Sequence, residues 1–346
     1  MSNLDLANDL CNKVTELGYS DCGIINVSDM AGYADKLEQR IKKVKMGKAQ
    51  FGKFKNFATP NEEYPWAKSV IIATFDYSKY KVPEPLQNKY AKKYLFDGRI
   101  DKRSDEYIAH HAVLAYLESM NIKAASEPRF GITALRYAAA TAGLGVLRNN
   151  NFLYSERGSY VALSAWLIDK ELSLKKTYSS PACPENCNKC ISACPTNALS
   201  APYCTSLLDC VSFKNSMASK HRFFRVPSQR ISALMGSNIF GCDICQDVCP
   251  MNRGKWIGEK DFPGLEELTP SMSSKAIMLM DYAEIEQKFA QKFWYIEKSH
   301  LWKWKINALT VLANSGDEEA LEYIRIGLSD SSALVRRFAK KLLSSR

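Results

Sequence analysis

The fold of this chain is decided by two stretches, CPENCNKCISACP at residues 183–195 and CDICQDVCP at residues 242–250. In both, the cysteines are separated by two or three residues, and both end in a Cys-Pro pair. Such runs bring two or three thiolates to one point, and in bacterial ferredoxins the cysteine before the proline binds the other of two clusters. The stretches therefore predict a small, loop-rich domain organised around two 4Fe–4S clusters.

Eight cysteines are the predicted cluster ligands. By the ferredoxin rule, the first cluster is bound by Cys183, Cys187, Cys190 and Cys249. The second cluster is bound by Cys194, Cys210, Cys242 and Cys245. The gap of three residues after Cys183 departs from the usual two, and Cys204 is an alternative to Cys210. Structural zinc and disulfides are competing interpretations, but a doubled Cys-x3-Cys-Pro signature is typical of iron–sulfur sites.

The composition indicates a folded protein in a reducing compartment. Hydrophobic residues make up 46% and charged residues 24% of the 346 residues, which argues against a disordered or collagen-like chain. We find no apolar run long enough to span a membrane, and the first residues, MSNLDLANDL, lack the features of a secretory signal. We therefore expect a cytoplasmic protein, in which clustered cysteines bind metals or carry electrons.

The flanking sequence predicts two further domains. Residues 1–174 alternate strand and helix patterns, which predicts a catalytic domain of α/β (α+β) class. Residues 175–256 form the ferredoxin-like double-cluster domain, and residues 257–346 are helical, with three amphipathic segments that resemble a HEAT-type repeat. Strands are expected at residues 22–27, 69–74 and 160–168, and helices at residues 6–17, 107–117 and 132–142.

Several motifs resemble the epoxyqueuosine reductase family. They are FGCDICQDVCPMN (240–252), CNKCISACPTNAL (187–199), AGLGVLRNNNFL (142–153), AKSVIIATFDY (67–77) and the C-terminal NALTVLANSGDEEA (307–320) and ALVRRFAKKLL (333–343). The resemblance implies a nitroreductase-like N-terminal domain that binds cobalamin. It also implies that two clusters reduce the cobalt and that epoxyqueuosine in tRNA is deoxygenated. Reductive dehalogenases are similar in sharing the corrinoid and the doubled cluster.

The resemblance also suggests residues that bind the cobalamin. Its candidates lie in the GLG motif, in the polar segment after it and on an upstream helix: Gly143, Gly145, Arg148, Asn149, Asn150 and His110. Glycines let the backbone approach a flat ring, and the polar side chains bond its amide and phosphate groups. The family has Gly-Lys where this chain has Arg148-Asn149. In the alternative interpretation, GLG ends a helix, the asparagines form a polar loop, and His110 faces solvent or has a purely structural partner.

One departure from the family concerns the proton donor. Counting back from GLG, the catalytic aspartate expected from the family falls on Arg129. Removal of oxygen requires an acid within hydrogen-bond reach of the leaving oxygen. The nearby candidates for that role are Glu127, Tyr107, Asp105 and Glu106. Arg129 would instead offer a fixed donor fork to an anionic group of the substrate.

The net charge of +10 is concentrated in two stretches. Residues 41–60 contain no acid and combine Lys42, Lys43, Lys45, Lys48, Lys53 and Lys55 with Phe51, Phe54 and Phe57. Residues 211–241 also lack acids and combine Lys214, Lys220, Arg222, Arg225 and Arg230 with Phe213, Phe223 and Phe224. Both stretches suit RNA, and the second also suits an acidic electron donor such as a flavodoxin or ferredoxin. The alternative is a solvated basic face.

The sequence thus favours an oxidoreductase of queuosine biosynthesis and tRNA processing. We expect a monomer that uses two 4Fe–4S clusters and cobalamin to convert epoxyqueuosine in tRNA to queuosine, without a membrane partner. One alternative keeps the cofactors and replaces the tRNA by a small molecule, as in dehalogenases. Another is an electron-transfer protein that binds no corrinoid.

Overall fold

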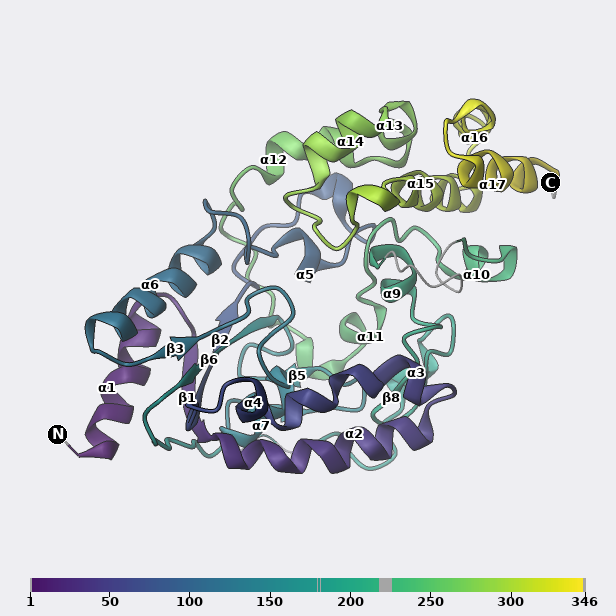
Figure 1. Ribbon diagram of the computed structural model, residues 1–346. Coiled ribbons are helices and arrows are strands. Elements are labelled where there is room, and N and C mark those ends of the chain that lie inside the picture. The colour runs from purple at the N-terminus through teal and green to yellow at the C-terminus, as the bar shows by residue number, and fades with distance from the viewer. Residues whose placement is uncertain (1, 179, 181, 218–225, 345–346) are drawn as a thin grey trace.

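The computed structural model describes residues 2–178, 180, 182–217 and 226–344 (Figure 1). Its N-terminal part contains a four-stranded sheet in the order β1-β2-β6-β3, and every neighbouring pair is antiparallel. The strands are β1 (Asp21–Asn26), β2 (Ser69–Asp76), β6 (Val161–Ile168) and β3 (Ala124–Ala125). This pairing gives the α+β form of the expected α/β (α+β) class.

Helices cover both faces of this sheet. Helices α1 (Asn3–Glu16) and α6 (Asp105–Ser119) pack on one face, and α7 (Leu135–Thr141) packs on the other. Successive strand residues point to opposite faces, so Ile71 joins the core beneath α1 and α6 while Ile72 joins the core beneath α7. Burial on both sides explains why the strand sequences are almost continuously apolar.

The sequence predicts the three long strands correctly but places the start of one helix too early. The three expected strands are confirmed as β1, β2 and β6. The helix expected at residues 132–142 begins only at Leu135. Before it, the chain bends, and the Thr133 hydroxyl donates a hydrogen bond to the Phe57 carbonyl at 2.9 Å. That bond attaches residues 132–134 to the distant 3-10 helix Gly52–Ala58, so they do not continue the helix.

Shorter elements connect the sheet to the cysteine-rich region. They are α2 (Gly32–Lys43), α3 (Gly47–Phe51), α4 (Pro60–Glu63), α5 (Lys92–Leu95), β4 (Val146–Leu147) and β5 (Leu153–Tyr154). Leu37, Val44 and Phe51 from α2, α3 and the turn between them form a small buried cluster with Cys204. This cluster attaches the N-terminal helices to the cysteine-rich region.

The cysteine-rich region contains only short elements, as expected for a domain organised by its metal. They are α8 (Lys189–Ser192), β7 (Leu199–Ala201), β8 (Cys204–Thr205), α9 (Val211–Ser216), α10 (Gln229–Leu234) and α11 (Ile244–Asp247). Figure 1 shows α9 and α11 between the sheet and the C-terminal helices. The region therefore contacts both of the other parts of the chain.

The C-terminal part is helical. Its helices are α12 (Leu265–Leu268), α13 (Ser274–Leu279), α14 (Tyr282–Phe289), α15 (Trp302–Asn314), α16 (Ala320–Ile326) and α17 (Ala333–Ser344). The three expected amphipathic segments correspond to α15, α16 and α17. The main apolar core runs without a break from the sheet through Phe96 and Phe262 to Trp304. Among the described helices, none has the length and apolar character needed to cross a membrane.

Candidate iron–sulfur site and its surroundings

The first predicted ligand set converges around Cys190. Its thiol lies within electrostatic reach of Cys183, Cys187 and Cys249, although Cys249 comes from the second cysteine run. Burial and these neighbouring thiols raise the pKa of Cys190. A metal that binds at such a site must displace the thiol protons. The positive charge of bound iron would then stabilise the four neighbouring thiolates.

The second predicted set converges in the same way. The thiol of Cys242 lies within electrostatic reach of Cys194 and Cys210, and that of Cys245 within reach of Cys210 and Cys242. Burial raises the pKa of Cys242 to about 12. Cys245 also interacts with Cys190 of the first set, so the two groups are neighbours. Two adjacent sets of four thiols have the chemistry that two cubane clusters require.

The placement of the possible ligand side chains can be compared with the placement that a single metal ion requires. In the part of the chain that the structure describes, no three His, Cys, Asp or Glu side chains gather around one point as the ligands of one ion do. A cubane cluster distributes its four thiolates over four irons, so its ligands need not converge as closely.

The polar segment after GLG contacts the cysteine runs. The Asn149 backbone N–H donates to Cys183 Sγ at 3.4 Å, and the Asn149 side chain donates to the Cys187 carbonyl at 2.9 Å. The Asn150 side chain donates to the Cys245 carbonyl at 3.0 Å. Both asparagines are buried. Their side chains bond the backbone of the cysteine runs, and their contact with a cobalamin stays a prediction.

Arg148 and the two glycines of GLG are also enclosed by protein. The Arg148 side chain is buried, donates to the Ser180 hydroxyl at 3.2 Å and lies over the Tyr154 ring. A side chain at Gly143, which has a φ of +76°, would collide with the Lys176 carbonyl. One at Gly145 would collide with the Tyr154 backbone. The close approach that these glycines permit in the structure is therefore between protein segments, and their part in binding a cobalamin stays a prediction.

His110 likewise points into the protein. Its ring is buried, stacks on Trp166 with centroids 5.1 Å apart and lies 3.0 Å from the Ser126 hydroxyl. Burial, with a smaller effect from His111, lowers the pKa of His110 to about 4. The imidazole is therefore neutral at physiological pH, and its contact with a cobalamin stays a prediction.

The buried imidazole makes stability depend on pH. An unfolded histidine has a pKa of about 6.5. Between pH 6.5 and 4, position 110 is therefore protonated in the unfolded chain but not in the folded chain. Stability is therefore present above pH 6.5 and is lost as pH falls, by up to about 1.4 kcal/mol per pH unit for one proton. In urea unfolding, the free energy of unfolding of His110→Gln should fall less than that of the parent protein between pH 6.5 and 4. Parallel curves for the two proteins would contradict the assignment.

The residue at the family's aspartate position lies on an exposed loop, residues 127–131. The Glu127 carboxylate accepts a hydrogen bond from the Arg129 backbone N–H at 3.1 Å, and Arg99 donates to the Arg129 carbonyl at 2.6 Å. The Arg129 guanidinium is exposed and lies 5.8 Å from the Trp294 ring centre. The loop is thus held from two sides, and its arginine faces solvent.

The other candidate acids have strong local partners. Asp105 accepts hydrogen bonds from Lys260 and Tyr80 at 2.7 and 3.0 Å. Burial acts to raise the pKa of Asp105, but the hydrogen bonds from Lys260 and Lys79 lower it to about 2. Asp105 is therefore ionised at neutral pH and holds no proton to give.

Glu106 and Tyr107 follow it on α6. The buried Glu106 carboxylate accepts the backbone N–H of Gly98 at 3.1 Å and lies 3.6 Å from the Lys93 ammonium. The Tyr107 ring packs against His111 with centroids 4.1 Å apart. Of the four candidate donors, Glu127 lines a cavity in the structure.

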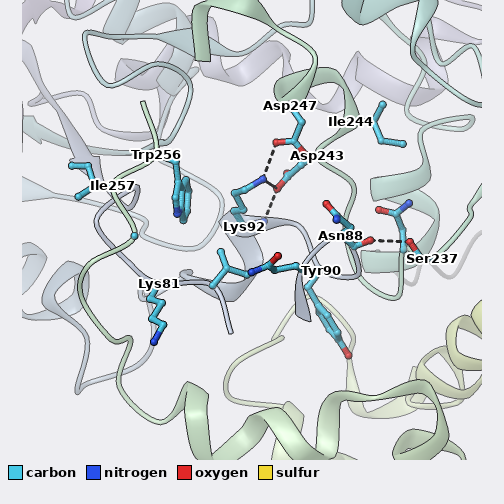
Figure 2. A pocket seen from close by; sticks show the side chains of 14 residues that line it. Lys81, Asn88, Tyr90, Lys92, Ser237, Asp243, Ile244, Asp247, Trp256 and Ile257 are labelled. Atoms are coloured by element: carbon cyan, nitrogen blue, oxygen red, sulfur yellow. Dashed lines mark hydrogen bonds and ion pairs between the residues drawn. The ribbon is translucent and has the colours of Figure 1, made fainter. Parts of the chain in front are cut away.

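A cavity of about 650 Å³ lies beside the second cysteine run (Figure 2). Its wall includes Asp243 and Ile244, which stand between Cys242 and Cys245, and Trp256. The Lys92 backbone N–H donates to the Asp243 carboxylate at 2.7 Å. Burial raises the pKa of Asp243 to about 6. The remaining polar lining is provided by Lys81, Gln87, Asn88, Tyr90, Ser237, Asn238 and Asp247. Sequence reasoning missed this cavity because its wall joins segments far apart in the chain.

A second cavity, of about 470 Å³, joins the first basic stretch to the 127–131 loop. Lys53, Phe57 and Glu127 all line it. The six lysines of residues 41–60 are exposed, as RNA contact requires. Phe51, however, is buried beneath Arg40, so it belongs to the core and cannot stack on a base. In the second basic stretch, the residues Lys220, Arg222, Phe223, Phe224 and Arg225 lie outside the described residues.

Comparison with known proteins gives consistent matches. A family described as a 4Fe-4S double cluster binding domain matches residues 183–252. The epoxyqueuosine reductase of Cellulophaga algicola is 28% identical over 257 residues, which are 70% of this chain and 77% of that protein. That of Bacillus subtilis is 27% identical over 277 residues, 76% of this chain and 67% of that protein.

The fold also matches solved structures. An epoxyqueuosine reductase crystallised with an epoxyqueuosine-modified tRNA-Tyr stem loop superposes with a TM-score of 0.75 at 22% identity. The superposition covers 99% of this chain and 90% of the other. The same mixed arrangement of helices and sheet therefore extends over nearly the whole molecule.

Proposed function

Because the chain is related to the epoxyqueuosine reductases in sequence and fold, we propose that it is a cobalamin- and iron–sulfur-dependent reductase that converts epoxyqueuosine in tRNA to queuosine. The observation that carries this proposal is the convergence of eight thiols into two adjacent sets. A lone electron carrier would need little more than the cysteine-rich part. Here the two sets are embedded between a sheet and a helical region, and a cavity lies beside the second cysteine run.

The proposed organisation follows the three sequence regions. Residues 1–174 form a nitroreductase-like domain, residues 175–256 the ferredoxin-like domain and residues 257–346 a helical region with a HEAT-like repeat. The protein acts as a monomer in the cytoplasm. An acidic donor such as a flavodoxin or ferredoxin supplies the electrons, and the exposed Arg230 supports such a contact on the ferredoxin-like domain.

The cavity beside the second cysteine run is the proposed cobalamin site. Gln87, Asn88 and Lys92 offer amide and ammonium groups that suit the amide-rich edge of a corrin, and Trp256 offers an apolar ring. When bound, the corrinoid supplies a strongly reducing cobalt that can break a carbon–oxygen bond. The chain's own residues orient the group: Lys92 is fixed by its bonds to Asp243 and Asp247 (Figure 2). Those contacts tie this wall of the cavity to a cluster-binding segment.

The 127–131 loop and the first basic stretch form the proposed tRNA contact. Exposed lysines neutralise phosphates, and the exposed Arg129 can grip a phosphate with two donors. Glu127 lines the cavity between these two features, and its carboxylate accepts the backbone N–H groups of Arg129 and Phe130. It is the proposed proton donor to the leaving oxygen, a role that requires it to bind a proton first and the modified base to reach both this cavity and the corrinoid.

Reversing the charge of Arg129 tests the tRNA contact. Arg129→Asp should lower turnover on the modified tRNA and reduce the salt dependence of tRNA binding by about one phosphate contact. Arg325→Asp, on the exposed side of α16, is the matched control and should change neither. Equal turnover and equal salt dependence of tRNA binding in the two variants would show that Arg129 does not contact the tRNA.

Anaerobic purification tests the function as a whole. We expect about eight irons per chain, as two 4Fe–4S clusters require, cobalamin after reconstitution, and conversion of epoxyqueuosine in tRNA. Iron without cobalamin binding would instead identify an electron carrier. Both cofactors with no activity on the tRNA would point to a small-molecule substrate.

A further inference from the structure

Phe130 is presented to solvent by a loop whose backbone is held in place. Among the aromatic side chains of the described residues it is the most exposed, at 62%. The Glu127 carbonyl accepts the Gly131 backbone N–H at 3.0 Å, and the Glu127 carboxylate accepts the Phe130 backbone N–H. Arg99 donates to the Arg129 carbonyl at 2.6 Å. The backbone around Phe130 is therefore fixed, and this fixed backbone holds the ring at the surface.

Trp294 orients the Phe130 ring. The two rings meet edge to face, with centroids 5.2 Å apart and an interplanar angle of 78°. The indole of Trp294 is itself supported by the Tyr295 ring, which stacks on it with centroids 4.0 Å apart. An edge-to-face contact with one partner cannot cover both faces of a ring. Together with the high exposure of Phe130, this leaves at least one face of its ring open to a planar ligand.

Cations border this pair of rings. The guanidinium carbons of Arg99 and Arg129 lie 5.3 and 5.8 Å from the Trp294 ring centre. An exposed aromatic face beside cations suits an unpaired nucleobase, because the base stacks on the ring while its phosphate meets the positive charge. An apolar protein partner would instead bury the exposed Arg129 guanidinium without supplying a counter-charge. The charge beside Phe130 therefore favours RNA as the ligand of this face.

The two sides of the loop serve different parts of that RNA. Of the described loop residues, Glu127 and Gly131 line the second cavity, and Phe130 does not. A modified base that reaches Glu127 therefore leaves the Phe130 ring to another base.

We propose that Phe130 is a stacking platform for an unpaired base next to the modified base of the tRNA. This inference rests on the proposed function and adds a substrate-binding residue to it. Every base has a flat aromatic face, so such a platform adds affinity for an unpaired loop and not for one particular sequence.

Phe130→Leu removes the ring and keeps an apolar side chain. In fluorescence anisotropy with an epoxyqueuosine-modified tRNA stem loop, the Kd should rise about tenfold, as expected for the loss of one base–aromatic stack. The slope of log Kd against log salt should stay the same, because no phosphate contact is lost. Phe130→Trp keeps a stacking ring and should bind as the parent protein does.

A fluorescent purine analogue, placed next to the modified base in the stem loop, reports the stacking itself. Its emission should fall when the parent protein binds and should fall less when Phe130→Leu binds at saturation. Equal quenching by the two proteins would show that the neighbouring base does not stack on Phe130.

Leu279→Ala is the control for the loss of an exposed apolar side chain. Leu279 ends α13 and is 64% exposed, and its replacement should leave the Kd unchanged. Equal Kd values for Phe130→Leu and the parent, with the stem loop bound by both, would overturn the inference alone. A parent protein that binds no tRNA would overturn the proposed function instead, so the two failures are distinguishable.

Discussion

Replacing Cys210 by alanine should lower the iron content from about eight to about four per chain, because one of two 4Fe–4S clusters loses a ligand. In the structure, Cys210 lies within electrostatic reach of Cys194, Cys242 and Cys245, the other members of the second set. Reductase activity should fall by more than about 100-fold, since changes around a metal site that spare its ligands already cost 10–100-fold.

Cys204 provides the matched control. The sequence alone leaves it as an alternative to Cys210, because both lie between the two runs. In the structure its thiol is buried among Leu37, Val44 and Phe51. Cys204→Ala should therefore keep all of the iron and lose only a little packing. Metal analysis after anaerobic purification, with circular dichroism to establish folding, decides between them. Loss of iron in Cys204→Ala and retention in Cys210→Ala would reverse the assignment.

Replacing Asp97 by alanine should destabilise the fold by about 3–5 kcal/mol, the usual cost of leaving a buried charge without its partner. The Asp97 carboxylate is fully buried and accepts hydrogen bonds from Arg99 at 2.8 and 2.6 Å and from the Tyr295 hydroxyl at 2.6 Å. Burial alone would raise its pKa, but Arg99 and Lys93 hold it far below the usual range. Without Asp97, the buried Arg99 loses its counter-charge.

The same change should loosen the 127–131 loop. Arg99 also donates to the carbonyls of Pro128 and Arg129, so trypsin should cleave after Arg129 faster in Asp97→Ala than in the parent. Asp101→Ala is the control, since the partner of Asp101, Arg103, is largely exposed and such pairs contribute about 1 kcal/mol or less. Equal stability losses in urea unfolding would show that the Asp97 network has no special role.

The parts of the molecule with strong local signals were predictable. The ferredoxin spacing predicts two sets of four cysteines, and in the structure Cys190 has Cys249 of the second run among its neighbours. The strands could be predicted because they are buried on both faces of the sheet and therefore contain few polar residues. The resemblance to the epoxyqueuosine reductases is confirmed by the curated relatives and by the shared fold.

Other details depend on contacts between distant segments, which the sequence does not specify. The glycines at positions 143 and 145 allow close approach to the Lys176 and Tyr154 backbones. The asparagines at positions 149 and 150 bond the cysteine runs. Glycine and asparagine permit close approach and hydrogen bonding without specifying the partner. Only the tertiary fold determines which group fills the space.

The unbroken apolar core that joins the sheet to Trp304 has a consequence for biosynthesis. While the chain is being made, the sheet emerges from the ribosome long before α15. Aromatic residues such as Phe96 then lack the C-terminal side chains that cover them in the finished molecule. The nascent protein should therefore depend on chaperones until translation ends, and premature termination should yield insoluble fragments.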